Sequence, residues 1–305
     1  NSRDNRGFDL MLKHKGKIGN VSYNINPMVS FSRGKYVSWE ENILPTDGAD
    51  GAANATYNNR YVLTGNWDDR QWGYQTNGFF TSQSQIDNHP VDIDGAGNVT
   101  LIVGNLIKID QNGDGLIDWR DQVVIGQGGM PKWNYSTNMG AKYKNWSLDM
   151  LWQGATGYTI TFGGAAGPWS HSGHQSVSKS FAYENRSLRG ANGDIEILRA
   201  FPPTFTTGGM PQIDQPASDF NKVDAMYLRL KTISLSYNIP KNIVDKIGLT
   251  SIQLYLAGSN LLTIDNLGVY SGSYDPEIVT GTAGGNIDRA YPNNKTLTTG
   301  IKIGF

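Results

Sequence analysis

The sequence predicts an all-β protein whose strands form part of a transmembrane antiparallel β-barrel. Apolar and polar residues alternate along segments of roughly 9–11 residues, the length that a tilted strand needs to cross a bilayer. The connections between these segments are alternately short and long, as they are on the two sides of an outer-membrane barrel. A half-buried strand of a soluble β-sandwich alternates in the same way, but a sandwich gives no reason to sort its loops by length.

The composition agrees with this class of protein. The chain has 305 residues, of which 37 are Gly, none is Cys and 17% are charged, and its mean hydropathy is −0.43. No run approaches the roughly 18 apolar residues of a membrane helix, and the lack of Cys excludes a disulfide-stapled fold. The net charge of −1 gives no electrostatic reason to expect a nucleic acid as partner.

The first predicted hairpin consists of strands over residues 6–15 and 20–32. In its second strand, the odd-numbered residues from Val21 to Phe31 are apolar or proline, and the even-numbered ones are polar except for a single Met. Pro27 lies within this strand and cannot donate a ladder hydrogen bond. We therefore expect either a bulge or a locally unpaired position there.

Five further strands are predicted from the same alternation, over residues 134–143, 146–155, 227–239, 251–262 and 295–305. In the segment 227–239 the apolar residues change parity near Lys231 and Thr232. Such a phase change indicates a bulge or a strand that leaves the membrane zone. The total of seven strands is odd, and it is too small to close a bacterial barrel, so we expect other strands to complete the wall.

The loop lengths give a topology. The predicted short turns are 16–19, 144–145 and 240–250, and the long connections are 33–133, 157–224 and 264–294. If the C-terminus is periplasmic, every long connection is extracellular and every short turn is periplasmic. The region 33–133 is then a long extracellular loop region.

A calcium-type loop is predicted within this region, at residues 110–121. The segment fits the pattern D-x-[DN]-x-[DN]-G with an acidic residue at position twelve, and its side chains offer the hard oxygen ligands that Ca²⁺ prefers. We expect a structural Ca²⁺ site rather than a sensor, because no amphipathic helix precedes the loop. The alternative is an Asp/Asn/Gly turn without metal. The expected ligands are Asp110, Asn112, Asp114, the Leu116 carbonyl, Asp118 and Asp121.

Several stretches resemble the C-terminal part of SusC/RagA-type TonB-dependent outer-membrane transporters of Bacteroidota. They follow the family's order over nearly the whole chain, and Ile109–Asp118 and Tyr227–Tyr237 carry most of the resemblance. The matching stretches are Asn5–Leu10, Gly78–Asp87, Ile109–Asp118, Tyr227–Tyr237, Gly258–Leu262, Tyr274–Glu277 and Gly304–Phe305.

The resemblance implies a fold, a location and partners. The family's proteins are similar to a 22-stranded barrel with an N-terminal plug, and 1–305 would be the last seven strands, without the plug and the TonB-contacting part. The resemblance further implies an outer-membrane location among lipid, a SusD-like surface lipoprotein as lid, TonB as the source of energy, and oligosaccharides or peptides as imported substrates. Phe305 matches the family's terminal signal for membrane assembly.

Candidate substrate contacts are aromatic residues of the long connections, because aromatic faces combine apolar area with polar neighbours. Each of them could instead serve loop packing or contact with the lid. They are Trp39, Trp67, Trp72, Tyr74, Trp119 and Trp169. Polar residues of the opposite strand face could line a passage or simply face water; they are Asn24, Asn26, Asn138, Gln253 and Tyr255.

We do not expect an enzyme. His171 and His174 share a Gly/Ser-rich stretch without a nearby acid, and Glu40 and Glu41 alternate sides, so they cannot form a facing acid pair. No nucleophile elbow, phosphate loop or HExxH motif is present. The alternative function is that of a soluble surface protein that binds glycans or mediates adhesion, and it differs from a barrel in needing no detergent.

Overall fold

The structure is a computed structural model that describes residues 1–40, 62–162, 184–203, 218–278 and 293–305. Eight strands form one antiparallel sheet in the order β1-β3-β8-β9-β12-β13-β14, and β2 pairs with β3 beside β1. The strands are β1 (Ser2–Met11), β2 (His14–Ile18), β3 (Val21–Ser38), β8 (Trp133–Tyr143), β9 (Trp146–Thr161), β12 (Lys222–Asn238), β13 (Ser251–Asp265) and β14 (Thr296–Gly304).

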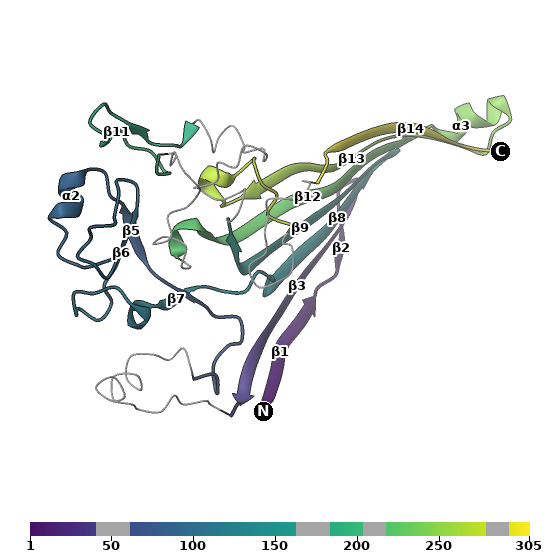
Figure 1. Cartoon of the computed structure of the whole chain (residues 1–305). Helices are drawn as coiled ribbons and strands as arrows, with labels where there is room; N and C mark the ends of the chain where they lie inside the picture. The colour runs from purple at the N-terminus through teal and green to yellow at the C-terminus, as the bar shows by residue number, and fades with distance from the viewer. Residues whose placement is uncertain (41–61, 163–183, 204–217, 279–292) are drawn as a thin grey trace.

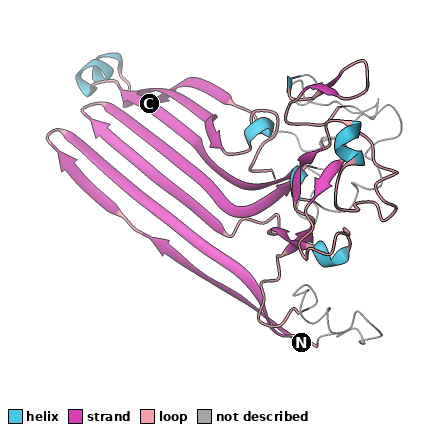
Figure 2. Ribbon diagram, turned by 90° about the vertical axis from the view of Figure 1, so that its left-hand side faces the viewer, coloured by secondary structure: helices cyan, strands magenta, loops and turns pink. Residues whose placement is uncertain are grey.

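The sheet is a curved wall with different structures at its two ends (Figure 1). One end carries the tight turns and the short helices α3 (Lys241–Val244) and η7 (Asp245–Ile247), together with the C-terminus. The connections that contain the small elements gather at the other end, where the N-terminus also lies (Figure 2). The all-β antiparallel fold predicted from the alternation is confirmed, and within the described residues the sheet has two edges, β1 and β14, and does not close.

Three strands continue five or six residues further than the sequence predicts. β3 extends to Ser38, β9 to Thr161, and β12 begins at Lys222. These extensions lie at the end with the long connections, and β3 there carries Ser, Arg, Gly and Lys, which give no apolar alternation. Its backbone nevertheless pairs with β1 as far as Ser2. The first long connection therefore starts after Ser38 and not at residue 33.

Pro27 produces an unpaired position without a bulge. The Leu12 N–H donates to the Pro27 carbonyl at 3.0 Å, but Pro27 has no N–H with which to return the bond. The pairs Met11–Met28 and His14–Ile25 on either side keep one register. The first predicted strand is consequently divided into β1 and β2 at this point.

The predicted phase change in β12 is a bulge. The register shifts between Leu230 and Thr232 against both neighbours, β9 and β13. Before the shift Leu230 lies opposite Trp152, and after it Ile233 lies opposite Met150. The bulge therefore keeps both apolar rows on one face of the sheet, although their parity in the sequence differs.

The apolar face of the sheet is exposed. Leu254, Leu256 and Ile301 are 40%, 46% and 60% exposed, and within the described part of the chain no second large sheet covers them. A β-sandwich would bury this face in its core. None of the described helices is long and apolar enough to span a membrane.

Aromatic rings mark both ends of the apolar face. Phe8, Phe31 and Trp133 cluster near the long connections, with Phe31 and Trp133 centroids 4.7 Å apart, and Trp146 packs on Tyr237 at 4.7 Å near the tight turns. Val21 of β3 pairs with Tyr143 at one aromatic row, and Phe31 belongs to the other. The two rows are therefore ten residue positions apart along β3. Ten residues span about 34 Å, or about 24 Å at a tilt of 45°, which matches the roughly 25 Å apolar band of outer-membrane barrels.

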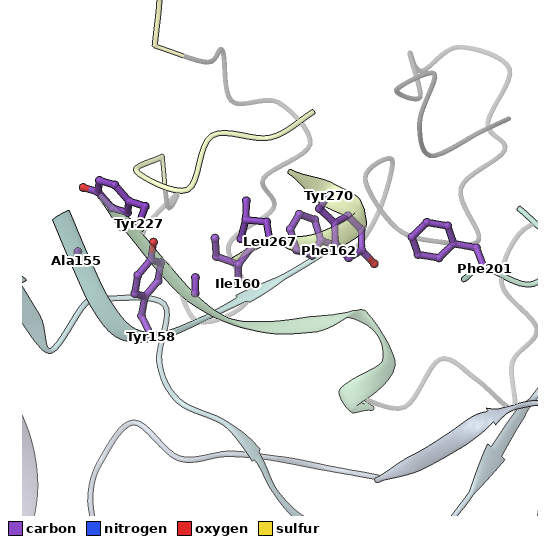
Figure 3. Packing of buried hydrophobic residues seen from close by; sticks show 9 residues of the cluster. Ala155, Tyr158, Ile160, Phe162, Phe201, Tyr227, Leu267 and Tyr270 are labelled. Atoms are coloured by element: carbon purple, nitrogen blue, oxygen red, sulfur yellow. The ribbon is translucent and has the colours of Figure 1, made fainter. Parts of the chain in front are cut away.

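The buried core lies where the connections pack on the strand ends. Tyr158 of β9, Phe162 directly after it and Tyr227 of β12 belong to one buried cluster with Leu267 and Tyr270 from the connection after β13, as Figure 3 shows. The rings of Phe162 and Tyr270 stack at 3.6 Å. A second cluster, formed by the connection between β3 and β8 itself, contains Phe80, Ile86, Ile93, Leu101 and Val103.

The small elements of the connections form two-stranded sheets and single turns. β4 pairs with β7, β5 with β6 and β10 with β11. Their bounds are β4 (Gln71–Gly73), β5 (Thr76–Phe79), α2 (Gln83–Asp87), β6 (Leu106–Lys108), η2 (Trp119–Asp121), β7 (Val123–Gly126), β10 (Leu188–Arg189), β11 (Ile195–Ile197), η6 (Asp219–Asn221) and η8 (Gly268–Tyr270).

Candidate functional site

The segment before β4 is held against the end of β3 by an ionic cluster. Arg33 donates from two nitrogens to the Asp69 carboxylate, at 3.0 Å and 3.2 Å, and the Lys132 Nζ lies 2.6 Å from Asp69 Oδ2. Burial alone would raise the pKa of Asp69, but the hydrogen bonds from Arg33 and Lys132 outweigh burial and hold the pKa below its usual value. This end of the wall is therefore rigidly tied to its first connection.

Two of the predicted substrate-stacking aromatics have other contacts. The Trp67 ring lies within 4.5 Å of the Arg33 guanidinium and 5.7 Å of the Lys35 ammonium, so cations contact its ring. Tyr74 is only 8% exposed, with Lys108 over its ring, and its hydroxyl accepts a hydrogen bond from Gln122 at 3.2 Å. These contacts favour a packing role for both residues.

Trp39 and Trp72 keep more of their surface accessible. Trp39 is 37% exposed and meets Tyr36 edge to face, with ring centroids 5.0 Å apart. Trp72 in β4 is half-buried beneath Arg70, whose guanidinium carbon lies 5.4 Å from the ring centroid. Trp119 is half-buried in η2. Trp169, His171 and His174 lie outside the described residues.

The polar residues predicted to line a passage occupy the face opposite the apolar rows. Asn26 lies directly opposite Asn138, and the Gln253 amide donates to the Asn238 side chain at 3.1 Å. Tyr255 lies opposite Gly300, where a Cβ would stand only 2.5 Å from the Tyr255 hydroxyl. This inner face is polar and closely packed.

The calcium-type loop is closed by hydrogen bonds of its own. Asp110 accepts the backbone N–H groups of Gly113 and Gly115 at 2.6 Å and 2.8 Å. Asp121 is fully buried and accepts those of Gln111 and Asp118 at 2.9 Å and 2.8 Å. Burial raises the pKa of Asp121, while in Asp110 the backbone N–H groups outweigh burial and lower the pKa.

Arg120 supplies a positive charge inside this loop that the sequence argument did not count. Its guanidinium lies 2.7 Å from Asp118 and 3.2 Å from Asp114. Asp118 and Asp121 also form a capping box that starts η2. Among the described residues no three His, Asp or Glu side chains converge in a metal-binding arrangement. The donor atoms have the chemistry that calcium prefers, but here backbone N–H groups and Arg120 occupy them.

A buried ionic cluster fastens the connection after β13 to the wall. Arg229 of β12, whose side chain is 4% exposed, donates to Asp275 at 2.6 Å and to Glu277 at 2.5 Å. Lys231 adds a bond to Glu277 at 2.7 Å, and the Tyr158 hydroxyl donates to the Pro276 carbonyl at 2.6 Å. We call these four charged residues the Arg229 clamp.

Sequence reasoning missed the Arg229 clamp although it singled out both stretches that form it. Arg229 and Asp275 are separated by 46 residues. Neither stretch alone indicates the other as its partner. The signal that could have found the pair is an Arg inside an otherwise apolar strand, since a buried charge requires a counter-charge.

A polar cavity of about 290 Å³ lies beside β7, and no sequence pattern indicates it. Residues of β7 and the residue after it line one side, and the remaining lining comes from the segment after β4, from η6 and from the start of β12. Its lining residues are Gln75, Val124, Ile125, Gly126, Gln127, Asp219 and Asp224.

These features define a class of protein. An antiparallel sheet with an exposed apolar face, aromatic rows at both ends of that face and long connections gathered at one end is the wall of a transmembrane β-barrel.

Over 66% of its length the chain is 27% identical to TonB-dependent receptor P3 of Formosa agariphila, and over 67% it is 28% identical to TonB-dependent receptor P26 of the same organism. It covers 19% and 20% of these relatives, so it spans about a fifth of their length. No family model matches the chain.

Solved structures agree with this similarity. The chain resembles the RagAB peptide importer in its open-open state with a TM-score of 0.59 at 18% identity, and in its closed-closed state with 0.56 at 16%. The likeness covers 99% of this chain and 29% and 30% of those chains. At such identities it shows the fold. The predicted resemblance to SusC/RagA-type TonB-dependent transporters is confirmed.

Proposed function

We propose that this chain is the C-terminal part of the barrel of a TonB-dependent importer in the outer membrane. The observation that carries the proposal is the sheet with one exposed apolar face and the long connections folded at a single end. The similarity to TonB-dependent receptors supports the same function. Import needs no covalent chemistry, so the chain acts by binding and passage and not as an enzyme.

The proposal includes a direction and two partners. The long connections face the outside and the tight turns and C-terminus face the periplasm, with Phe305 as the assembly signal. A SusD-like surface lipoprotein covers the extracellular end, and TonB acts through parts of the transporter other than this chain. The substrate is an oligosaccharide or a peptide; the structural neighbour RagAB is a peptide importer.

The function can be tested by deleting the gene that encodes this chain. We expect the deletion strain to lose growth on at least one of a panel of oligosaccharides and peptides supplied as sole nutrient, and plasmid-borne wild type to restore it. The tagged transporter should co-purify a surface lipoprotein from detergent-solubilised outer membranes. Unchanged growth on the whole panel, with no lipoprotein in the purified material, would contradict the proposal.

The alternative, a soluble glycan-binding or adhesive protein, makes an opposite prediction. Such a protein would remain monodisperse without detergent, because its apolar surfaces would be covered. The exposed Leu254, Leu256 and Ile301 favour the barrel instead. Size-exclusion chromatography of the purified protein with and without detergent separates the two.

We further propose that residues 110–121 bind Ca²⁺ as a structural staple of the first long connection. Binding requires Arg120 to leave Asp114 and Asp118, so the two cations compete for the same carboxylates. The donor set of three Asp side chains, Asn112, the Leu116 carbonyl and Asp121 supports the proposal.

Limited proteolysis of the complete transporter tests the calcium proposal. Ca²⁺ should protect the connection between β3 and β8, Mg²⁺ should not, and Asp114→Ala should abolish the difference. Asp245→Ala, in the short connection between β12 and β13 at the other end of the wall, is the matched control. This variant should keep the difference between Ca²⁺ and Mg²⁺. Equal cleavage with Ca²⁺ and with a chelator in the wild type would exclude a calcium staple.

A further inference from the structure

The polar cavity beside β7 lies where three parts of the chain meet. Gln75 follows β4, Asp219 opens η6, and Asp224 belongs to the first residues of β12. The Asp219 N–H donates to the Tyr74 carbonyl at 3.1 Å, and the Thr159 hydroxyl of β9 donates to Asp224 at 2.7 Å. The walls of the cavity are thus fixed to the barrel wall and to the first long connection at once.

The cavity presents hydrogen-bond acceptors that have no protein partner. Asp219 uses one carboxylate oxygen, Oδ1, for the Thr76 hydroxyl at 2.6 Å, and Asp224 uses its Oδ1 for Thr159. Within the described residues, the second oxygen of each carboxylate accepts no hydrogen bond, and the Gln127 side chain makes none. Two carboxylate oxygens and an amide are therefore available to a ligand.

Neither carboxylate forms a contacting ion pair in the part of the chain that the structure describes, although the positive charge of Lys132 acts on Asp224 from a longer distance. Among the described residues, no Lys or Arg nitrogen comes within 4.0 Å of Asp219 or Asp224. The lysines nearby are engaged elsewhere: the Lys222 Nζ donates to Gln71 and Thr161 at 2.7 Å and 2.8 Å, and the Lys132 Nζ pairs with Asp69. A cation entering the cavity would meet two negative groups whose charges are not neutralised by a contacting base.

We propose that this cavity is a subsite for a positively charged group, an ammonium or a guanidinium, of the transported substrate. The proposal rests on the import function and specifies its substrate class. A volume of about 290 Å³ accommodates a basic side chain or a single amino-sugar ring. Asp219 and Asp224 bind the charge, and Gln75 and Gln127 bind the polar atoms beside it, because charge-assisted hydrogen bonds are the strongest that such a site can form.

Binding by the complete transporter with its lipoprotein partner, in detergent, tests the subsite. The probes are acetyl-Gly-Lys-Gly-amide against its norleucine counterpart, and the glucosamine trimer against the N-acetylglucosamine trimer. At least one cationic probe should bind roughly tenfold or more tightly than its neutral partner. If the peptide pair shows the difference, the charge comes from a basic side chain, and if the sugar pair shows it, the charge comes from an amino sugar. Asp219→Asn with Asp224→Asn should remove the discrimination, since the amides keep the size and the bonds to Thr76 and Thr159.

Asp149→Asn on β9 is the matched control, because it removes a carboxylate outside the cavity, and it should leave the discrimination unchanged. Equal binding of both members of both pairs would overturn the proposal, as would discrimination that survives in the double variant. Growth of the same strains on the nutrient panel separates this failure from failure of the import function. A wild type that imports without favouring cations contradicts only the subsite.

Discussion

Tyrosines lie over glycines of neighbouring strands at three positions of the wall, and each pair is directly opposite in register. The pairs are Tyr23 with Gly16, Tyr135 with Gly154, and Tyr255 with Gly300. Each glycine lacks a side chain, and the tyrosine ring of the neighbouring strand lies over its backbone. The cost of adding a Cβ differs among them, because the atoms that it would meet differ.

Gly154→Ala should therefore destabilise the barrel more than Gly300→Ala. At Gly154 the new Cβ would lie 2.3 Å from the Tyr227 carbonyl oxygen, which the ladder holds in place. At Gly300 it would meet only the Tyr255 ring, which can tilt away. We expect a loss of about 1–3 kcal/mol for the first and less than about 1 kcal/mol for the second. Unfolding midpoints in detergent measure both, and equal midpoints would contradict the assignment.

Arg229→Met should release the connection after β13 from the wall. It leaves Asp275 buried without its cation, a change that costs about 3–5 kcal/mol in comparable buried pairs. Lys231→Met is the control, because Glu277 keeps its bond to Arg229. We expect proteolysis within 266–295 to accelerate in the first variant and to change little in the second. Similar cleavage of both would show that Arg229 is not the residue that holds this connection.

The clamp also predicts a pH dependence. Burial opposes the charge on Asp275, but the Arg229 bond and the N–H groups of Asn293 and Glu277 outweigh burial and lower the pKa below 3.8. A carboxylate with a depressed folded-state pKa stabilises the structure above its unfolded value, and this stabilisation is lost as the pH falls through the folded value. Protection of the connection should therefore be constant from pH 7 to about pH 5 and should fall only below about pH 4. A loss of protection between pH 7 and pH 5 would exclude Asp275 as the group responsible.

Among the elements, β12 shows how one extra residue can orient a whole strand. The bulge at Lys231 keeps Leu228 and Leu230 on the apolar face and turns Arg229 to the inside. Deleting Lys231 would restore a regular ladder and turn Arg229 outward, where a charge costs up to about 2–4 kcal/mol at the membrane midplane. The deletion should abolish assembly, seen as loss of the heat-modifiable band on gels, whereas Lys231→Ala should assemble. Normal assembly of the deletion variant would contradict the role of the bulge.

The elements that could be predicted from the sequence are those that lie in the membrane zone. There one face must be apolar, so alternation marks every strand and even the bulge at Lys231. Beyond that zone the strands continue with polar residues, and the pattern disappears, as in β3 after Phe31. β4 to β7 are three to four residues long and depend on partners far along the chain, so local sequence could not reveal them.

The candidate site was less predictable for the same physical reason. Residue type alone predicts Trp67 and Tyr74 as substrate contacts, whereas in the structure Arg33 and Lys108 lie over their rings. The cavity and the Arg229 clamp both form where residues of β12 meet connections that are distant in the sequence. Gln75 and Asp224, which line the same cavity, are 149 positions apart. Arg120 lies within the motif itself, but the motif pattern does not indicate its pairing with Asp114 and Asp118.

At the scale of the whole molecule, the edges of the sheet require additional strands. Within the described residues β1 and β14 each pair with the sheet on one side only. Unpaired backbone groups cannot face lipid, because no water is there to bind them. The chain covers 29% of the RagAB chain with which its fold agrees. In a membrane both edges must therefore pair with strands outside the described residues.

The orientation of the wall across the outer membrane is the central claim, and the absence of native Cys in this chain allows a direct measurement. Val99 lies in the first long connection and is 79% exposed, and Ile247 lies in the short connection between β12 and β13 and is 60% exposed. Each is replaced by Cys in a separate variant. In intact cells that produce the full transporter, a membrane-impermeant maleimide should label residue 99 at once. Residue 247 should react only after the outer membrane is permeabilised. Immediate labelling of both positions in intact cells would contradict a transmembrane wall with its long connections outside.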